Sequence, residues 1–235
     1  MSVIFWAGVP SYSCNVVVER FPNQPGPSRR YETIQVAGRN GDLLIDTGAY
    51  DNYTQPYEVY FNANQNKTPA GARAVRAWLQ SPIGYQRLED SYDPEFYRMA
   101  YYAGPTVIEN AMNLFGRLTI SFVCKPQRWR KDGERSIPMA KSQTLYNSLF
   151  PALPLIKVNG TAAGNLYVGS YRVQIKELND YIMLDSELQD AYREEQNKNN
   201  TISTSAFPIL EHGENAISWD GGITGIEVTP RWWTI

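Results

Sequence analysis

The pattern of hydrophobic and polar positions predicts short β-strands over most of the chain. Two stretches alternate with a period of two residues, which is the repeat of a strand with one buried face. Their inward positions are Tyr53, Gln55, Tyr57, Val59 and Phe61 in the first stretch, and Leu118, Ile120, Phe122 and Cys124 in the second. A flat, half-buried sheet face therefore runs through the first half of the sequence.

One segment has helical spacing instead. Its apolar positions are Ala72, Val75, Ala77, Trp78 and Leu79. Thr68 can cap the helix and Pro69 fits its first turn. Proline disfavours helical geometry at the residue before it, so Ser81-Pro82 ends the helix. We predict a single helix over about 69–80.

The other predicted elements are runs of apolar and β-branched residues between turn residues. The runs are 16–18, 31–36, 95–103, 106–112, 153–158, 165–168, 171–175 and 181–184, with 215–219 and 223–228 read as a hairpin around Asp220-Gly221-Gly222. Residues 21–28 hold three prolines and a glycine, which predicts a loop. The polar, Asn-rich stretch 190–200 is interpreted as a solvated loop, and the apolar C-terminus as a docked segment.

The strand pattern breaks between Lys125 and Arg135, where Pro126, Gly133 and several basic residues occur. We place a domain boundary there, with one domain over 1–128 and a second over 137–235. Short strands at the spacing of the second half suggest a β-sandwich. The fold class expected for the chain is all-β with one helix.

Composition narrows the classes of function. The chain has 235 residues, of which 43% are hydrophobic, so it can bury a sizeable core. Its 22 Lys and Arg nearly balance 24 Asp and Glu, whereas nucleic-acid binders usually carry a basic excess on one face. No apolar stretch reaches the roughly 20 residues of a membrane helix. Tyrosine, at 16 residues, suits strand faces and interfaces.

Two cysteines, Cys14 and Cys124, lie far apart in sequence. The N-terminal residues lack the basic region and apolar run of a secretory signal. We therefore expect both to be buried thiols of a protein made in a reducing cytoplasm. A disulfide closing one long loop is the less favoured alternative.

The sharpest enzymatic candidate is Asp46, in the stretch Leu-Leu-Ile-Asp-Thr-Gly-Ala at 43–49. Aspartic proteases use such a loop twice, so that two carboxylates share one proton. A lone copy could act only in a homodimer. The favoured interpretation is a turn between strands, in which Asp and Gly supply the geometry.

Other candidate chemistry is weaker. His212 is the one histidine, so any Ser-His-Asp site would need it, and a solvated loop is favoured for it. Asp90, Asp93 and Glu95, with Glu89, could offer oxygens to calcium, but a charged turn bent at Pro94 is favoured. The cysteine and histidine counts exclude the usual zinc sites. Gly221-Gly222 opens no helix and so makes no phosphate loop. We expect no catalytic, metal or cofactor residue.

A carbohydrate-binding module is the main alternative. Exposed indoles of Trp219, Trp232 and Trp233 could stack on sugar rings. The same residues could instead fill the core of a sandwich, which is favoured because tryptophan is highly buried on average.

Several ordered stretches together resemble one family, the distal tail proteins of siphophages. The stretches are 38–44, 84–94, 116–122, 125–128, 150–158, 214–222 and 230–233. They are collinear and cover nearly the whole chain. Each is moderately specific alone, and the ordered set is highly specific.

The resemblance implies an N-terminal, β-sandwich-like domain with one helix that builds a six-fold ring, and a galectin-like β-sandwich outside it. The ring would join the tail tube protein to the tail-tip, lysin or adsorption proteins and leave a passage for DNA. The chain would be assembled in the host cytoplasm and belong to the virion. The family's basic form offers no catalytic residues, and the galectin sugar set of His, Asn and Arg is not found around His212. The sequence does not specify the ring contacts.

Overall fold

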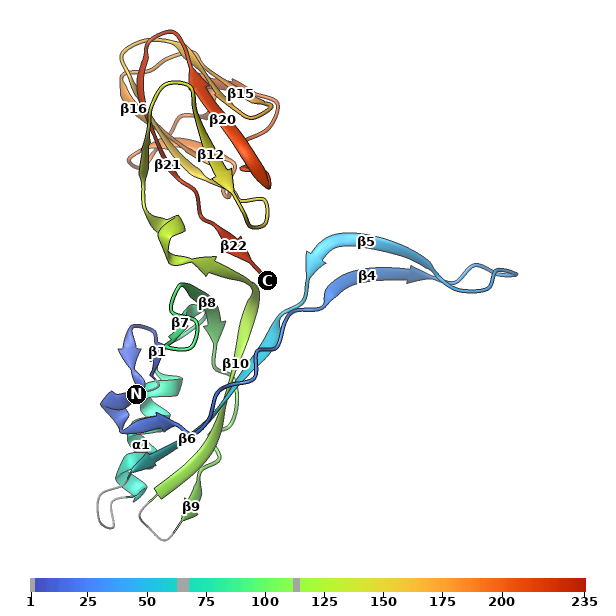
Figure 1. The fold of residues 1–235 in the computed structure, drawn as a ribbon, viewed down its shortest axis with the longest axis vertical. Helices are drawn as coiled ribbons and strands as arrows, with labels where there is room; N and C mark the ends of the chain where they lie inside the picture. The colour runs from blue at the N-terminus through green and yellow to red at the C-terminus, as the bar shows by residue number, and fades with distance from the viewer. Residues whose placement is uncertain (1–2, 63–67, 112–114) are drawn as a thin grey trace. The chain divides into compact units, whose positions relative to one another are not determined.

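The computed structural model describes residues 3–62, 68–111 and 115–235 (Figure 1). Strands dominate this part of the chain, together with one α-helix and three short 3-10 helices, so the predicted all-β class is confirmed. The chain forms two compact units. The first takes in the described residues up to Arg128, and the second is Trp129–Thr234.

The first unit is organised around one sheet with the order β2-β1-β7-β8-β10-β6-β3, and β9 pairs with β10. Its strands are β1 (Ile4–Trp6), β2 (Val9–Pro10), β3 (Val16–Val18), β6 (Tyr53–Asn62), β7 (Gln86–Asp90), β8 (Phe96–Tyr101), β9 (Glu109–Ala111) and β10 (Phe115–Arg130). Strands β6 and β10 pair antiparallel from Phe115↔Asn62 to Cys124↔Tyr53. All nine inward positions predicted for these two strands are buried.

The helix predicted over about 69–80 is confirmed as α1 (Thr68–Gln80), and its apolar residues join the core of this unit. Val75, Trp78 and Leu79 point into the core, whereas Ala77 is exposed and was wrongly assigned to the apolar face. The indole of Trp6 donates to the carbonyl of Leu79 at 3.3 Å, which ties the helix to β1. The side chain of Thr68, predicted to cap this helix, is not among the side chains that the structure describes.

Two strand predictions in this unit need correction. The break expected at Lys125 is wrong, because β10 continues through Pro126 to Arg130. Pro126 lies beyond the last position paired with β6, so its missing N–H leaves no ladder bond unmade on that side. The strand expected over 106–112 is reduced to β9, and its last residue, Met112, lies outside the described residues.

The second unit is a sandwich of two sheets, β11-β21-β13-β16-β17-β18 and β12-β20-β14-β15-β19. Its strands are β11 (Ile137–Met139), β12 (Gln143–Asn147), β13 (Leu155–Gly160), β14 (Gly164–Val168), β15 (Tyr171–Ile175), β16 (Asp180–Asp185), β17 (Asp190–Arg193), β18 (Gln196–Asn197), β19 (Ile202–Thr204), β20 (Gly213–Trp219) and β21 (Ile223–Thr229). Alternate residues of both sheets fill one core, among them Ile156, Val168 and Ile217. This arrangement confirms the predicted sandwich.

The hairpin expected over 215–228 is wrong. Strand β20 pairs with β12 and β14, and β21 pairs with β11 and β13, so residues 220–222 carry the chain from one sheet to the other. The solvated loop expected over 190–200 is also wrong. It forms the small β17–β18 hairpin, in which the side-chain amides of Asn197 and Asn199 donate to Asp190 Oδ1 at 2.8 and 2.6 Å. The docked C-terminus is confirmed within the second unit. The carbonyl of Trp232 accepts from the Arg130 amide at 2.8 Å, and in β22 (Trp233–Thr234) the indole of Trp233 donates to the carbonyl of Pro151 at 2.9 Å.

Candidate self-assembly surface

The first unit carries a β-hairpin that forms a two-stranded sheet of its own, apart from the main sheet (Figure 1). Its strands are β4 (Arg29–Ile34) and β5 (Leu43–Tyr50), paired antiparallel from Ile34↔Leu43 to Tyr31↔Asp46 and closed at Arg29↔Tyr50. Gly38 and Gly41 adopt φ of 76° and 81° in the connection, values that favour glycine. These two glycines therefore allow the chain to turn between β4 and β5.

The hairpin exposes large apolar side chains on both faces. They are Tyr31, Ile34, Val36, Leu43, Leu44 and Ile45, each between 40% and 57% exposed. An isolated two-stranded hairpin is only marginally stable in water. A contiguous exposed apolar patch marks an interaction site in a soluble protein. The surface of β4 and β5, called the hairpin arm below, is thus suited to being covered by another protein surface.

Asp46 lies within β5 and not in a turn between strands, so the favoured sequence interpretation is wrong in this respect. The register shifts here because extra residues of β5 bulge opposite Arg30, and Gly48 adopts a φ of 71°. The Gly48 amide donates to Asp46 Oδ1 at 2.9 Å. This amide, together with a hydrogen bond and ion pair from Arg29, lowers the pKa of the Asp46 carboxyl. Asp46 is therefore an ionised, ion-paired group that shapes a β-bulge.

The proline-rich loop at the base of the arm is held by side chains of the main sheet. Gln55 on β6, which is 1% exposed, donates from its side-chain amide to the carbonyl of Asn23 at 2.8 Å. Arg128 on β10 donates to the carbonyl of Pro25 at 3.0 Å. The ring centroids of Phe21 and Tyr92 lie 4.2 Å apart. These contacts fix the loop predicted over 21–28 where the arm begins.

A buried polar cluster lies beside this attachment. Arg98 donates to Asp90 Oδ2 at 3.1 Å and to the Tyr53 hydroxyl at 3.1 Å, and the Tyr57 hydroxyl donates to the same Asp90 oxygen at 2.6 Å. Burial, followed by the charge of Asp90, raises the pKa of Tyr57 well above its ordinary value. Burial alone would lower the pKa of Arg98, but Tyr57, Tyr53 and Asp90 raise it. Every member of the cluster is paired inside the unit.

The remaining candidate residues are not brought together. Asp90 binds Arg98 and Tyr57, while Glu95 is exposed, and within the described residues no group of three His, Cys, Asp or Glu could hold a metal ion. His212 is exposed in the loop before β20, as predicted. None of the helices in the described part of the chain could cross a membrane.

The cysteines and tryptophans do not all have the burial expected for them. Cys14 and Cys124 are free thiols, and Cys14 is half-exposed, so the expectation that both are buried is wrong for Cys14. Trp219 and Trp232 are 7% and 4% exposed in the sandwich core, which confirms the core interpretation for these two. Trp233 is half-buried. Its ring centroid lies 4.9 Å from that of Phe150, and its indole donates to the carbonyl of Pro151.

Sequence reasoning missed the hairpin arm as a unit. The available signal was the run Leu43-Leu44-Ile45, three consecutive apolar residues beside a glycine-containing turn. Such a run has no polar face, so in an exposed strand it indicates that both faces are covered by a partner. The Asp-Thr-Gly motif that follows resembles a protease loop but forms part of the same strand.

Comparison with solved structures finds similarity to phage proteins over nearly the whole chain. The crystal structure of the Dit protein of phage SPP1, described as a paradigm of the hub adsorption apparatus in phages that infect Gram-positive bacteria, matches with a TM-score of 0.77 and 10% identity over 100% of both chains. A chain of the phage P2 baseplate in its activated conformation with Ca matches with a TM-score of 0.50 and 9% identity, over 97% of this chain and 96% of that one. No protein-family model and no curated protein sequence matches. The chain therefore has the fold of the SPP1 Dit protein over its whole length.

Proposed function

We propose that this chain is a structural hub protein of a long, non-contractile phage tail, and that its copies join into a ring through the hairpin arm. The observation that carries the proposal is the exposed apolar surface of the arm. It occurs on a chain whose whole fold is similar to that of a phage hub protein. A monomer would leave this surface in water, whereas an assembled hub would bury it.

The attachment of the arm supports a ring in particular. Gln55 and Arg128 hold the base of the arm to the sheet of its own unit, while its strands lie apart from that sheet. An arm that docks on a different surface of the next copy makes a heterologous contact. Repeated contacts of this kind close into a ring when the rotation between copies closes. We propose a six-fold ring with a central passage for DNA.

The proposed ring would give the chain a connecting role in the tail. The ring would connect the tail tube protein to the tail-tip, lysin or adsorption proteins, within a virion assembled in the host cytoplasm. We propose that the chain is structural and not an enzyme. The ion pair of Asp46 with Arg29 supports this, because a protease dyad needs a second carboxylate to share its proton. The burial of Trp219 and Trp232 removes two of the three indoles that favoured a lectin.

Negative-stain electron microscopy of the purified full-length protein, with light scattering at the same concentrations, tests the proposal. We expect rings with a central opening and a mass of six copies. A chain that stays monomeric even at high protein concentration would contradict the hub proposal. Closed dimers would contradict the ring.

A further inference from the structure

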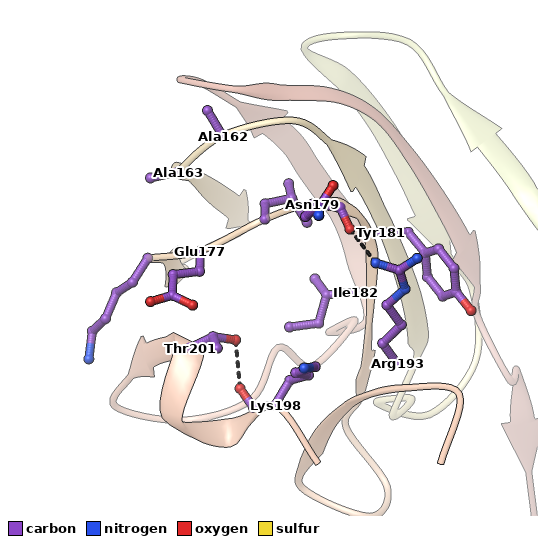
Figure 2. A pocket seen from close by; sticks show the side chains of 11 residues that line it. Ala162, Ala163, Glu177, Asn179, Tyr181, Ile182, Arg193, Lys198 and Thr201 are labelled. Carbon is purple, nitrogen blue, oxygen red and sulfur yellow. Dashed lines mark hydrogen bonds between the residues drawn. The ribbon is translucent and has the colours of Figure 1, made fainter. Parts of the chain in front are cut away.

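A cavity of about 430 Å³ opens at one end of the second unit, in a place that the hub proposal does not use (Figure 2). The connection between β15 and β16 forms one wall, and the residues that follow β18 form another. The volume lies in the range of small-molecule sites. Its floor is apolar, since Leu178 and Ile182 are 6% and 2% exposed.

Charged and polar side chains surround this floor. Lys198 and Thr201 come from one wall, and Glu177 and Asn179 from the other (Figure 2). Lys176 also lines the cavity. Within the described residues no carboxylate forms an ion pair with either lysine. Lys198 is only half-exposed. The lining thus includes two lysines without an ion pair and one carboxylate, that of Glu177.

The third cation of the cavity has a structural role. Arg193 donates to the carbonyl of Asn179 at 2.6 Å and to Asp180 at 3.1 Å. Its guanidinium and the ammonium of Lys157 each lie 5.1 Å from the centre of the Tyr181 ring. Tyr181 is thus held by two cations, and Arg193 fixes the wall that carries Asn179.

We propose that this cavity binds an acidic saccharide, meaning a sugar that carries one carboxylate or one phosphate. An ammonium is a compact point charge that recognises such an anion. Glu177 and Asn179 can exchange hydrogen bonds with sugar hydroxyls. The Thr201 hydroxyl donates to the carbonyl of Lys198 at 2.7 Å and can still accept from a sugar hydroxyl. Leu178 and Ile182 can support the apolar face of a sugar ring. A dense polyanion fits less well, because Glu177 would repel it.

Saturation-transfer NMR on the full-length protein tests this inference with four probes: glucose 1-phosphate, glucuronate, glucose and inorganic phosphate. We expect transfer to at least one acidic sugar, and the comparison of the two identifies the anion. Glucose and inorganic phosphate should bind more weakly, since each lacks half of the recognised groups. Lys198→Gln should weaken the acidic sugar about tenfold, as loss of a hydrogen bond to a charged group typically does.

Lys176→Gln provides a second variant, and Lys141→Gln is the matched control, because Lys141 is exposed in the same unit but does not line the cavity. Absence of transfer to both acidic sugars at millimolar concentration would overturn the proposal. So would equal binding of glucose, equal binding of inorganic phosphate, or an affinity that neither Lys198→Gln nor Lys176→Gln changes. Ring formation in the microscope is a separate result, so the two proposals can fail independently.

Discussion

Arg98 and Asp90 form an ion pair of 3.1 Å inside the first unit, with both side chains only 2% exposed. Removing one partner of a buried pair leaves the other charge uncompensated, which costs about 3–5 kcal/mol. We therefore predict that Arg98→Met lowers the free energy of unfolding of the first unit by that amount. Urea unfolding followed by hydrogen-exchange mass spectrometry measures the loss for this unit separately.

The control for this prediction is Arg20→Met in the same unit. Arg20 pairs with Glu58, but the two side chains are 67% and 42% exposed. Exposed pairs contribute about 0–1 kcal/mol. Equal losses for the two variants would mean that the buried cluster adds nothing beyond a surface pair.

Trp232 and Trp233 are neighbours with different surroundings. Trp232 is 4% exposed, so Trp232→Ala should destabilise the second unit by about 3–5 kcal/mol. Trp233 is half-buried, so Trp233→Ala should cost less, roughly 0.5–3 kcal/mol. Thermal unfolding of the two variants gives the order directly. A larger loss for Trp233 would show that its contacts with Phe150 and Pro151 dominate the packing of the C-terminus.

The second unit should lose stability in acid through Asp185. Burial alone would raise the pKa of this carboxyl, but the paired hydrogen bonds from Arg231 and those from the amides of Leu188 and Glu187 lower it. A carboxyl with a lowered pKa adds stability above its unfolded pKa of about 3.9, and this is lost as the pH falls through the folded value. We expect Arg231→Gln to reduce the drop in melting temperature between pH 6 and strongly acidic pH. An unchanged drop would assign acid unfolding to other carboxyls.

Leu44 lies on the hairpin arm opposite Thr33 and is 57% exposed. If the arm docks on a neighbouring copy, Leu44→Asp buries an unpaired charge in that contact and should abolish ring formation. The fold should remain intact, because the side chain packs little against its own chain. Leu188→Asp is the matched control, since Leu188 is 69% exposed in the second unit. Light scattering that finds rings with Leu44→Asp would exclude the arm as the ring contact.

The elements predicted well are those whose burial leaves a repeat in the sequence. Strands β6 and β10 each bury one face, so every second residue is apolar, except Gln55, whose buried side chain is hydrogen-bonded. Helix α1 buries Ala72, Val75 and Leu79 at helical spacing. The hairpin arm leaves no such repeat, because its apolar residues have no core in their own chain to face.

The partners of strands β20 and β21 could not be predicted from local sequence. The residues Asp220-Gly221-Gly222 suit a tight turn whether the chain pairs with itself or crosses to another sheet. The choice depends on the edges offered by β14 and β13, which come from distant parts of the sequence. The cavity beside Ile182 was missed for the same reason, since its walls meet only after both sheets have formed.

The charged residues 129–136, which lie between the two predicted domains, belong to the second unit. The Arg130 amide donates to the carbonyl of Trp232 at 2.8 Å, and the Arg231 amide donates to the carbonyl of Gly133 at 2.8 Å. Gly133 is buried, and a Cβ added there would lie 2.5 Å from the backbone nitrogen of Trp232. Residues 129–136 are thus packed against the C-terminal strand and should not be removed as a linker.

We predict that a fragment of residues 129–235 is a folded monomer and that 137–235 is less stable. The shorter fragment loses at least two backbone hydrogen bonds, those between Arg130 and Trp232 and between Arg231 and Gly133, each worth about 0.5–1.5 kcal/mol, and it uncovers Trp232. A fragment of residues 1–128 keeps the hairpin arm together with Gln55 and Arg128, which hold its base, and should therefore self-associate. Light scattering gives the mass of each fragment, and urea unfolding compares the two C-terminal ones. If 1–128 is monomeric and 129–235 is oligomeric, the ring contact must lie in the sandwich, because only the fragment that contains the contact surface can assemble.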